Sequence, residues 1–461
     1  MKARNDSTLL PSSFLFLAAF LSALPLFSAP AEVSKFFSLD NGLRVFLLEK
    51  RDVPLLNVVT AVNLGSKDET AETSGLVHIL EHCILFRGTG ARAGGDAGLA
   101  ARRRGAYFNA HTDQDLSLFE IALPVEDTDF AFRHQRALLF GLELGPEDLA
   151  SEKEIILEEL SMLEDDATRL GIALVQNSVF KGHPYEQPVY GSRDVIRAVT
   201  ADQVLAFYRA YFVPSNAVMA LVGDFDLAGM EAKVRAAFGD VPNAAAPSAS
   251  FPKASRLEKS VERTEYLDVG EATLVLGWPA PDADHPDQFA LDVLTEVCGR
   301  GVNPMLNGVL RGGRRELVKT LSMSYLARSY GGIAILVMTL DPKNVAAAKR
   351  LAVDFMRRAR NLNFAKSDVI GEEQFYAFDY LGSAKNQIRF TVEAFRESGL
   401  NVARSLAKYI LCSGSSEGTD YLAAIDKLTS TDLRRVAGRV FSSSEYAAVA
   451  ILPKSRMDKR P

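Results

Sequence analysis

The chain has 461 residues, of which 48% are hydrophobic and 24% charged, a length and composition typical of a globular protein with two or three domains. Its formal net charge of −6 argues against a nucleic-acid-binding protein, because binding to phosphates needs clustered positive charge. The three cysteines, Cys83, Cys298 and Cys412, are far apart and odd in number. We therefore expect no disulfide framework.

The first 31 residues have the features of an export signal. Lys2 and Arg4 precede an apolar run from residue 14 to residue 27, and Ala29-Pro30-Ala31 offers small residues at the positions that a signal peptidase reads. The run is short for a helix that spans a membrane, so an uncleaved anchor is the weaker alternative. We expect an exported chain, periplasmic or secreted, with no membrane span after the signal is cleaved.

The first elements expected after this signal are strands. Asp40-Asn41-Gly42 separates the apolar runs 36–39 and 43–48. Asn-Gly between such runs favours a hairpin with a type I′ turn, in which both central residues have positive φ. Further strands are expected over residues 56–64 and 116–123. The first of these leads into the helix on which the interpretation of the whole chain depends.

An apolar helix is expected over residues 75–85, with His78 and His82 one turn apart on one face and Glu81 beside them. Burying two histidines and a carboxylate without partners is costly, and one divalent metal would satisfy all three. Imidazoles at positions i and i+4 suit zinc, and His-x-x-Glu-His is the inverted form of the common zinc-protease helix. The bare pattern also arises by chance, so its interpretation depends on the rest of the chain.

A second helix offers a third metal ligand. Glu152, Ile156, Glu159 and Leu163 fall on one stripe of this helix, whereas Glu158 points about 100° away from Glu159. A carboxylate on a buried face needs a cation, so Glu159 is the better candidate ligand. The competing interpretation is an exposed, glutamate-rich helix edge, which we would prefer if the two histidines were absent.

The second half of the chain repeats the pattern of the first. A linker rich in alanine and proline is expected over residues 240–256. Residues 199–222 and 428–451 each predict a helix that begins after a threonine and is followed by an alanine- and valine-rich strand. The second half also opens with a strand over residues 272–278 and a helix from Phe289. The chain therefore contains a weak internal repeat about half its length.

The two halves differ at the metal-binding helix. Alignment of strand with strand and helix with helix places Asp292, Thr295 and Glu296 opposite the three polar residues of that helix. Two carboxylates and a hydroxyl replace the two histidines and the glutamate. We therefore expect the metal and the chemistry in the first half only.

Several motifs occur together in the order found in the pitrilysin family of zinc peptidases, also called insulinase-like or M16. The chain most resembles the short, processing-peptidase-like branch of that family, over most of residues 36–240. The motifs that carry the resemblance are residues 40–43, His78-Ile79-Leu80-Glu81-His82, residues 86–89, Asn109-Ala110-His111-Thr112, residues 152–159, His183-Pro184-Tyr185 and residues 214–224.

The resemblance implies an α+β fold of two similar domains, each a mainly antiparallel sheet covered by helices, the LuxS/MPP-like metallohydrolase fold. After the signal peptide at residues 1–31, residues 32–245 would form the catalytic domain. Residues 257–461 would form the domain without metal. Two such chains are expected to enclose a chamber, either as a heterodimer with a related M16-type subunit, which we favour, or as a homodimer.

The resemblance also implies roles for individual residues. The metal ligands of the family match His78, His82 and Glu159, in agreement with the helical-face argument, and the expected metal is Zn2+. The accompanying acidic residue of the family matches Glu152. The edge strand against which a peptide substrate lies extended matches Asn109 and Ala110.

The second half departs from the family pattern. Family members that complete the site offer an arginine and, seven residues later, a tyrosine that contact the substrate carbonyl. Tyr325 resembles that tyrosine, but Val318 stands seven residues before it. Arg311 could take the role only if an insertion separates the two. The expectation is a degenerate second half, with a partner chain supplying these groups.

The function predicted from the sequence is hydrolysis of peptide bonds at zinc, with Glu81 taking the proton of the attacking water. A hydroxyl such as that of Tyr325, or its counterpart in the partner, would stabilise the oxyanion. Two alternatives remain at this point. One is a catalytically idle assembly or scaffold subunit, and the other is a processing peptidase dedicated to one peptide precursor.

Overall fold

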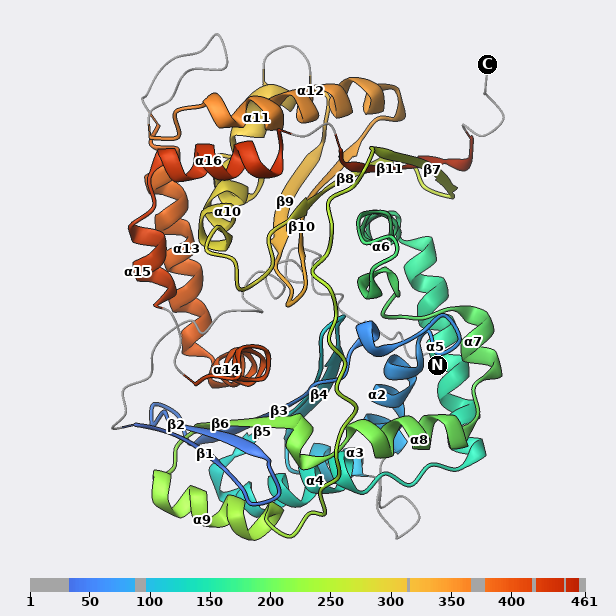
Figure 1. The fold of residues 1–461 in the computed structure, drawn as a ribbon, viewed down its shortest axis with the longest axis vertical. Coiled ribbons are helices and arrows are strands. Elements are labelled where there is room, and N and C mark those ends of the chain that lie inside the picture. Colours follow the sequence, from blue (N-terminus) through green and yellow to red (C-terminus); the bar gives the residue numbers. More distant parts are fainter. Residues whose placement is uncertain are drawn as a thin grey trace, which may run out of the picture.

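The structure of the chain, a computed structural model, describes residues 33–87, 97–312, 316–365, 378–416, 420–442 and 445–455. The expected signal peptide at residues 1–31 lies outside this part. Among the described helices, none is both long and apolar enough to cross a membrane. The described chain is built around two β-sheets, one from each half (Figure 1).

The first sheet has six strands in the order β1-β2-β6-β3-β5-β4, and the second has five in the order β7-β11-β8-β10-β9. Only the pairs β2–β6 and β11–β7 are parallel, so both sheets are mainly antiparallel, as predicted. The strands are β1 Ser34–Ser38, β2 Arg44–Glu49, β3 Leu55–Val62, β4 Tyr107–Thr112, β5 Ser117–Pro124, β6 Ala217–Gly223, β7 Val261–Leu267, β8 Ala272–Ala280, β9 Thr320–Leu326, β10 Gly332–Leu340 and β11 Ala447–Pro453.

Helices cover both sheets. Those of the first half are α2 Leu76–Arg87, α3 Ala97–Arg103, α4 Thr128–Phe140, α5 Pro146–Asp165, α6 Ala167–Val179, α7 Arg193–Ala198, α8 Ala201–Tyr211 and α9 Leu227–Phe238. Those of the second half are α10 Gln288–Thr295, α11 Met305–Leu310, α12 Val345–Arg358, α13 Tyr380–Glu397, α14 Gly399–Ser413, α15 Tyr421–Asp426 and α16 Ser430–Val440, with a π-helical turn at Glu296–Arg300.

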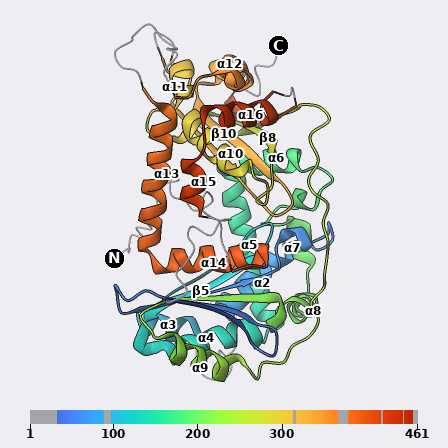
Figure 2. The ribbon, with the colours of Figure 1, turned by 60° about the vertical axis from the view of Figure 1, so that its left-hand side comes forward.

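The first sheet is buried on both faces, which explains the continuous apolar runs of its central strands. Val45 and Leu47 of β2 pack on one face against α2, α4, α5, α8 and α9. Phe46 and Leu48 point to the other face, where they meet Leu406 and its apolar neighbours on α14. Figures 1 and 2 show α14, an element of the second half, lying across this sheet of the first half.

The second sheet is covered in the reciprocal way. Its own helices pack on one face, while α6 of the first half packs on the other, with Val175 and Val179 against Val275 and Val449. A Cβ atom at Gly277 of β8 would lie 2.2 Å from Val175 Cγ1, so this close approach requires glycine. Each half therefore lends one helix to the sheet of the other, and neither sheet is covered on both faces by its own half alone.

The hairpin predicted at residues 40–42 is present, but its predicted turn type is wrong. β1 and β2 pair antiparallel. Gly42 has a φ of 86°, whereas Asn41 has no positive φ, so the turn is not type I′. The Asn41 side chain instead donates hydrogen bonds to the carbonyls of Phe238 and Val241, at 2.8 and 3.0 Å. Asn41 therefore ties the hairpin to the end of α9.

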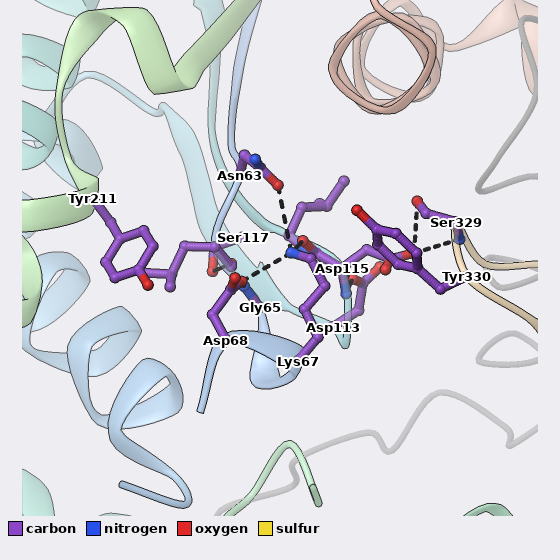
Figure 3. Close-up of polar contacts among 12 residues, drawn as sticks. Asn63, Gly65, Lys67, Asp68, Asp113, Asp115, Ser117, Tyr211, Ser329 and Tyr330 are labelled. Carbon is purple, nitrogen blue, oxygen red and sulfur yellow. Dashed lines mark hydrogen bonds and ion pairs between the residues drawn. The ribbon is translucent and has the colours of Figure 1, made fainter. Parts of the chain in front are cut away.

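A turn of the second half is fixed to the β4–β5 hairpin of the first at Asp115 (Figure 3). The Ser329 amide and hydroxyl donate to Asp115 Oδ2 at 3.0 and 3.2 Å, and the Tyr185 hydroxyl donates to Oδ1. Lys67 Nζ donates to the Asp115 carbonyl at 2.5 Å. Both halves therefore hold the loop that follows β4.

A buried ion pair makes a second connection between the halves. Arg404 of α14 donates two hydrogen bonds to Glu120 of β5, from Nε at 2.5 Å and from Nη2 at 2.6 Å. Tyr107 of β4 donates a third bond to Glu120 at 3.0 Å. Burial opposes the charged form of this carboxylate, but Arg404 and His111 outweigh burial and lower the pKa of Glu120 to about 2.

Replacing Arg404 by methionine would leave Glu120 buried without its cation, which costs about 3–5 kcal/mol of unfolding free energy. The double variant Arg404→Met with Glu120→Gln is expected to regain part of this loss, because a neutral amide still accepts from Tyr107. Denaturant titration of the two single variants and the double variant measures the coupling. If the loss of unfolding free energy in the double variant equals the sum of the losses in the two single variants, the two side chains do not stabilise the fold as a pair.

The predicted repeat is present in the structure. Thr200 and Thr429 cap the helices α8 and α16 in the same way, and each helix is followed by a buried strand. In the second half, Asp292 of α10 is buried and accepts from the Tyr421 hydroxyl at 3.1 Å, while Glu296 accepts from Arg300 Nε at 2.6 Å. Burial raises the pKa of Asp292 to about 7.

This pKa predicts a pH-dependent stability. Because the folded state binds the Asp292 proton more tightly than the unfolded state, stability should fall as pH rises from about 4 to about 7, by at most about 1.4 kcal/mol per pH unit. Asp292→Asn removes this contribution, so the stability of the variant relative to that of the wild type should be higher at pH 8 than at pH 5. Unfolding midpoints of both proteins at pH 5 and at pH 8 test this. A stability difference between the two proteins that is the same at both pH values would contradict it.

Candidate metal centre

Helix α2, which carries the candidate ligands His78 and His82, has its first turn fixed by a buried carboxylate. Glu69, itself buried, accepts hydrogen bonds from the amides of Gly75 and Val77, at 2.9 and 2.7 Å. These amides belong to the first turn, where helices leave donors without intrahelical partners. The apolar residues of α2 pack in the core between the first sheet and α5. His78 and His82, one turn apart, are thereby held 6% and 5% exposed.

His78, His82 and Glu159 converge as the sequence predicted, and among the described residues they form the one histidine, cysteine or carboxylate group suited to a metal ion. Glu159 Oε2 lies 3.7 Å from His78 Nε2 and 3.5 Å from His82 Nε2. Ligands of a tetrahedral zinc ion lie roughly 3.3–3.5 Å apart. The two-histidine, one-carboxylate set therefore fits zinc in both chemistry and spacing.

The neighbours of Glu159 on α5 lie as the helical stripe predicted. Glu158 is exposed, whereas Glu152 is fully buried one heptad before Glu159. Glu152 Oε2 lies 3.2 Å from His82 Nδ1, the ring nitrogen that faces away from Glu159. A carboxylate in this place fixes the tautomer and orientation of a ligating histidine. The structure therefore places Glu152 behind His82.

Two histidines of one helix are oriented by different means. His82 is held by Glu152, whereas His78 Nδ1 is buried with no hydrogen-bond partner among the described residues. The His78 ring instead makes edge contacts with the rings of His82 and Tyr190, at centroid distances of 4.8 and 5.0 Å. Ring packing therefore orients the first histidine.

The charges of the centre are coupled. Burial lowers the pKa of His78 to about 4. Burial also opposes the charged form of His82, but Glu152 and Glu159 outweigh burial and raise the pKa of His82 to about 9. The same contact with His82 lowers the pKa of Glu159. One proton therefore stays on His82 at neutral pH until a metal cation takes its place.

Glu81 lies beside the three ligands without joining them. Its carboxylate is hydrogen-bonded to the Thr112 side chain of β4, and burial raises its pKa. This contact turns Glu81 toward the strand next to the metal centre. A carboxylate with a raised pKa beside a metal centre has the properties of a general base.

A cavity of about 260 Å³ opens beside the metal centre. It contains several residues that the sequence analysis did not single out, Asp113, Gln114, Val189 and Tyr190. No local pattern marks them, because they come from the segment after β4 and from the segment before α7. The full lining is His78, Glu81, Ala110, His111, Thr112, Asp113, Gln114, Val189 and Tyr190.

Asn109 and Ala110 lie on β4, which ends the strand order of the first sheet and is thus an edge strand, as expected. Ala110 is buried and lines the cavity, while Asn109 is half-buried and contacts His111 at 3.4 Å. The edge strand therefore borders both the cavity and Glu81. Their role in substrate binding stays a prediction.

The structure does not bring Tyr325 to the metal ligands. Tyr325 is 2% exposed in the core of the second half, and its hydroxyl donates to the Pro281 carbonyl at 2.6 Å. Arg311 lies at the surface end of α11, 3.6 Å from Glu316. Neither side chain lines the cavity, so the described chain gives no support to their predicted contact with a substrate carbonyl.

The fold and the candidate ligand set resemble those of peptidases that bind zinc through an inverted His-x-x-Glu-His helix. Residues 44–193 match the family described as "Insulinase (Peptidase family M16)", and residues 198–370 match "Peptidase M16 inactive domain". The chain belongs to the M16, or pitrilysin and insulinase-like, family of peptidases.

Relatives support this membership. An uncharacterised zinc protease of Streptomyces coelicolor is 27% identical over 413 residues, 87% of this chain and 85% of the relative. A protease from Helicobacter pylori has a similar structure, with a TM-score of 0.82, 22% identity, and coverage of 91% of this chain and 99% of the other. A structure described as a peptidase M16 inactive domain, from Pseudomonas fluorescens, has a TM-score of 0.77, 17% identity, and coverage of 91% and 98%.

The position of Glu152 predicts an effect on metal affinity. Glu152→Gln removes the charge behind His82, and we expect zinc affinity to fall about 10- to 100-fold. Competition with a chelating dye measures this, with Glu154→Gln as the control, because Glu154 is exposed on the same helix. Equal affinities for the variant and the wild type would show that Glu152 does not hold the ligand.

Proposed function

We propose that this chain is a zinc metalloendopeptidase that hydrolyses peptide bonds in extended peptides. The observation that carries the proposal is the convergence of His78, His82 and Glu159 from two helices, with Glu81 beside them at a cavity. The names of the relatives, which include zinc proteases, support both the metal and the reaction class. The dedicated processing of one precursor is a narrower form of the same proposal.

Zinc bound by these three ligands would supply a Lewis acid that polarises a carbonyl and makes water acidic. The chain's own contribution is proton transfer by Glu81. Its carboxylate takes a proton from the attacking water and later gives that proton to the nitrogen of the leaving amine. Its bond to Thr112 keeps the carboxylate beside the edge strand, where the scissile bond would lie.

The edge strand β4 supports the choice of an extended peptide as substrate. The described sheet has no strand beyond β4, so its outer backbone groups can pair with a peptide that adds as a further strand. Ala110 and Thr112 would then carry the peptide past Glu81 and the metal ligands. Recognition of this kind reads the main chain and tolerates varied side chains.

We further propose that the chain is exported and works with a second M16-type chain, a related subunit in preference to a second copy. The charged residues before the apolar run at residues 14–27 support export. The buried position of Tyr325 supports a partner, because the described residues of the second half place no arginine and tyrosine pair at the cavity. The structural relative described as an inactive domain is consistent with the scaffold alternative. A scaffold, however, does not require five polar residues gathered in one site, which here are His78, Glu81, His82, Glu152 and Glu159.

Glu81→Gln tests the proposed reaction. The variant keeps the shape of the side chain and its contact with Thr112 but cannot accept the water proton. Zinc content should stay near one ion per chain, while cleavage of a quenched peptide should fall by about two to four orders of magnitude. Cleavage should be measured both with and without co-expressed M16-type partners.

Glu158→Gln is the matched control, since Glu158 is exposed next to a metal ligand and faces away from it. Its activity should equal that of the wild type. Full activity of Glu81→Gln would remove Glu81 from the reaction. A wild type that binds zinc but cleaves nothing in any combination would favour the scaffold alternative.

A further inference from the structure

The Tyr325 hydroxyl, which the sequence analysis considered as a donor to the substrate carbonyl, does not reach the candidate metal centre. The Tyr325 hydroxyl is bonded to the Pro281 carbonyl and lies in the core of the second half. A second tyrosine, Tyr190, borders the cavity together with His78 and Glu81. Its hydroxyl has no hydrogen-bond partner among the described residues. We propose that Tyr190 is a catalytic residue that donates a hydrogen bond to the carbonyl oxygen of the scissile peptide bond.

Two glycines fix the position of Tyr190. Gly191 has a φ of 76° and Gly75, at the start of α2, has a φ of 97°. A Cβ atom at Gly191 would lie 2.2 Å from Gly75 Cα, so the backbones touch with no room for a side chain. The Ser192 amide also donates to the Ser74 carbonyl at 3.3 Å. The residue before Gly191 is therefore placed beside the first turn of the metal-binding helix.

The ring of Tyr190 is fixed as well. Its centroid lies 5.0 Å from that of His78, with an interplanar angle of 72°. The ring is half-buried and lines the cavity, as the end of β4 does. The hydroxyl of Tyr190 is therefore carried on a ring that packs against the candidate ligand His78, in a cavity that Glu81 also lines.

The charges near Tyr190 suit a neutral donor. Burial raises the pKa of Tyr190, Arg169 opposes this, and the carboxylates of Glu159 and Glu81 raise it further. The hydroxyl therefore keeps its proton at neutral pH. The ring of Tyr190 contacts His78 and lines the same cavity as Glu81, which places it next to the candidate metal ligands.

The inference rests on the proposed peptidase function and adds one interaction to it. As the water oxygen bonds to the carbonyl carbon, Glu81 takes the water proton and the π electron pair of C=O moves onto the carbonyl oxygen. Tyr190 donates a hydrogen bond to that oxygen and keeps its proton. When the C–N bond breaks, the electron pair re-forms C=O and the nitrogen takes the proton from Glu81. The hydrogen bond is strongest while the oxygen carries charge.

Tyr190→Phe tests this role, because it removes the hydroxyl and keeps the ring against His78. Loss of one oxyanion donor typically lowers kcat by about 10²- to 10³-fold. We expect such a fall in kcat with KM and zinc content unchanged. The affinity for a phosphinic peptide, which is tetrahedral at the reacting centre, should fall by the same factor as kcat/KM. The affinity of the Glu81→Gln enzyme for an uncleaved peptide should not change when Tyr190→Phe is added.

Tyr211→Phe is the matched control, because it removes a tyrosine hydroxyl from α8 that does not line the cavity. Its kinetics should match the wild type. If Tyr190→Phe loses zinc, raises only KM, or keeps full activity and inhibitor affinity, the inference is wrong while the peptidase proposal stands. If the wild type itself neither cleaves peptides nor binds the phosphinic peptide, the proposed peptidase function is wrong, and the inference about Tyr190 is wrong with it.

Discussion

The packing of α2 against α5 is the constraint on which the rest of the first half depends. Two imidazoles and a carboxylate meet at the contact between these helices, in surroundings that are otherwise apolar. Such groups are tolerated in a core only when each has a partner of opposite charge or a hydrogen bond. Glu152 partners His82, and Glu159 faces both histidines.

The helix ends show how this contact is built from local sequence. Glu69 fixes where α2 begins, and the Gly75–Gly191 contact fixes which segment lies against its first turn. α5 then runs past α2 with Glu152 and Glu159 one heptad apart on the facing side. Glu159 Oε2 lies 3.7 and 3.5 Å from the Nε2 atoms of His78 and His82, close to the spacing of tetrahedral zinc ligands, so zinc could bind between these helices in place of the proton on His82.

The half without metal takes part in the site through the reciprocal helices. Asp113, at the cavity wall, is paired with Lys408 of α14 at 2.7 Å. Gln114, also at the wall, donates to Gln176 of α6, which in turn accepts from Arg328 of the second half. The end of β4 is therefore positioned by contacts from both halves. A second domain kept without metal has a structural reason to persist, since it holds one wall of the cavity.

Much of the fold followed from the sequence because its signals are local. The helices α8 and α16 each begin after the threonine from which the sequence predicted them, and each is followed by the predicted strand, β6 or β11. Glu159 was separated from Glu158 by helical geometry alone, and the exposure of Glu158 agrees.

The errors and omissions depend on distant contacts. Asn41 indicated a type I′ turn, but its side chain is bonded to the end of α9 almost 200 residues away. Tyr325 matched a family pattern, but its hydroxyl donates a hydrogen bond to the Pro281 carbonyl in the core of the second half. Tyr190 carries no motif of its own, and only the close approach of two glycine backbones brings it to His78.

The second half carries other polar residues at the repeat positions of the candidate metal ligands. Asp292 and Glu296 occupy the repeat positions of the two histidines, and Glu296 lines a small cavity together with Tyr380 and Gln387 of α13. Arg300, one turn after Glu296, binds that carboxylate and attracts Asp292 as well. A guanidinium with fixed donors can neutralise a buried acidic pair without leaving an open coordination position. Arg300 thus supplies positive charge to the carboxylates of the second half, at the repeat positions where the first half carries the candidate metal ligands His78 and His82.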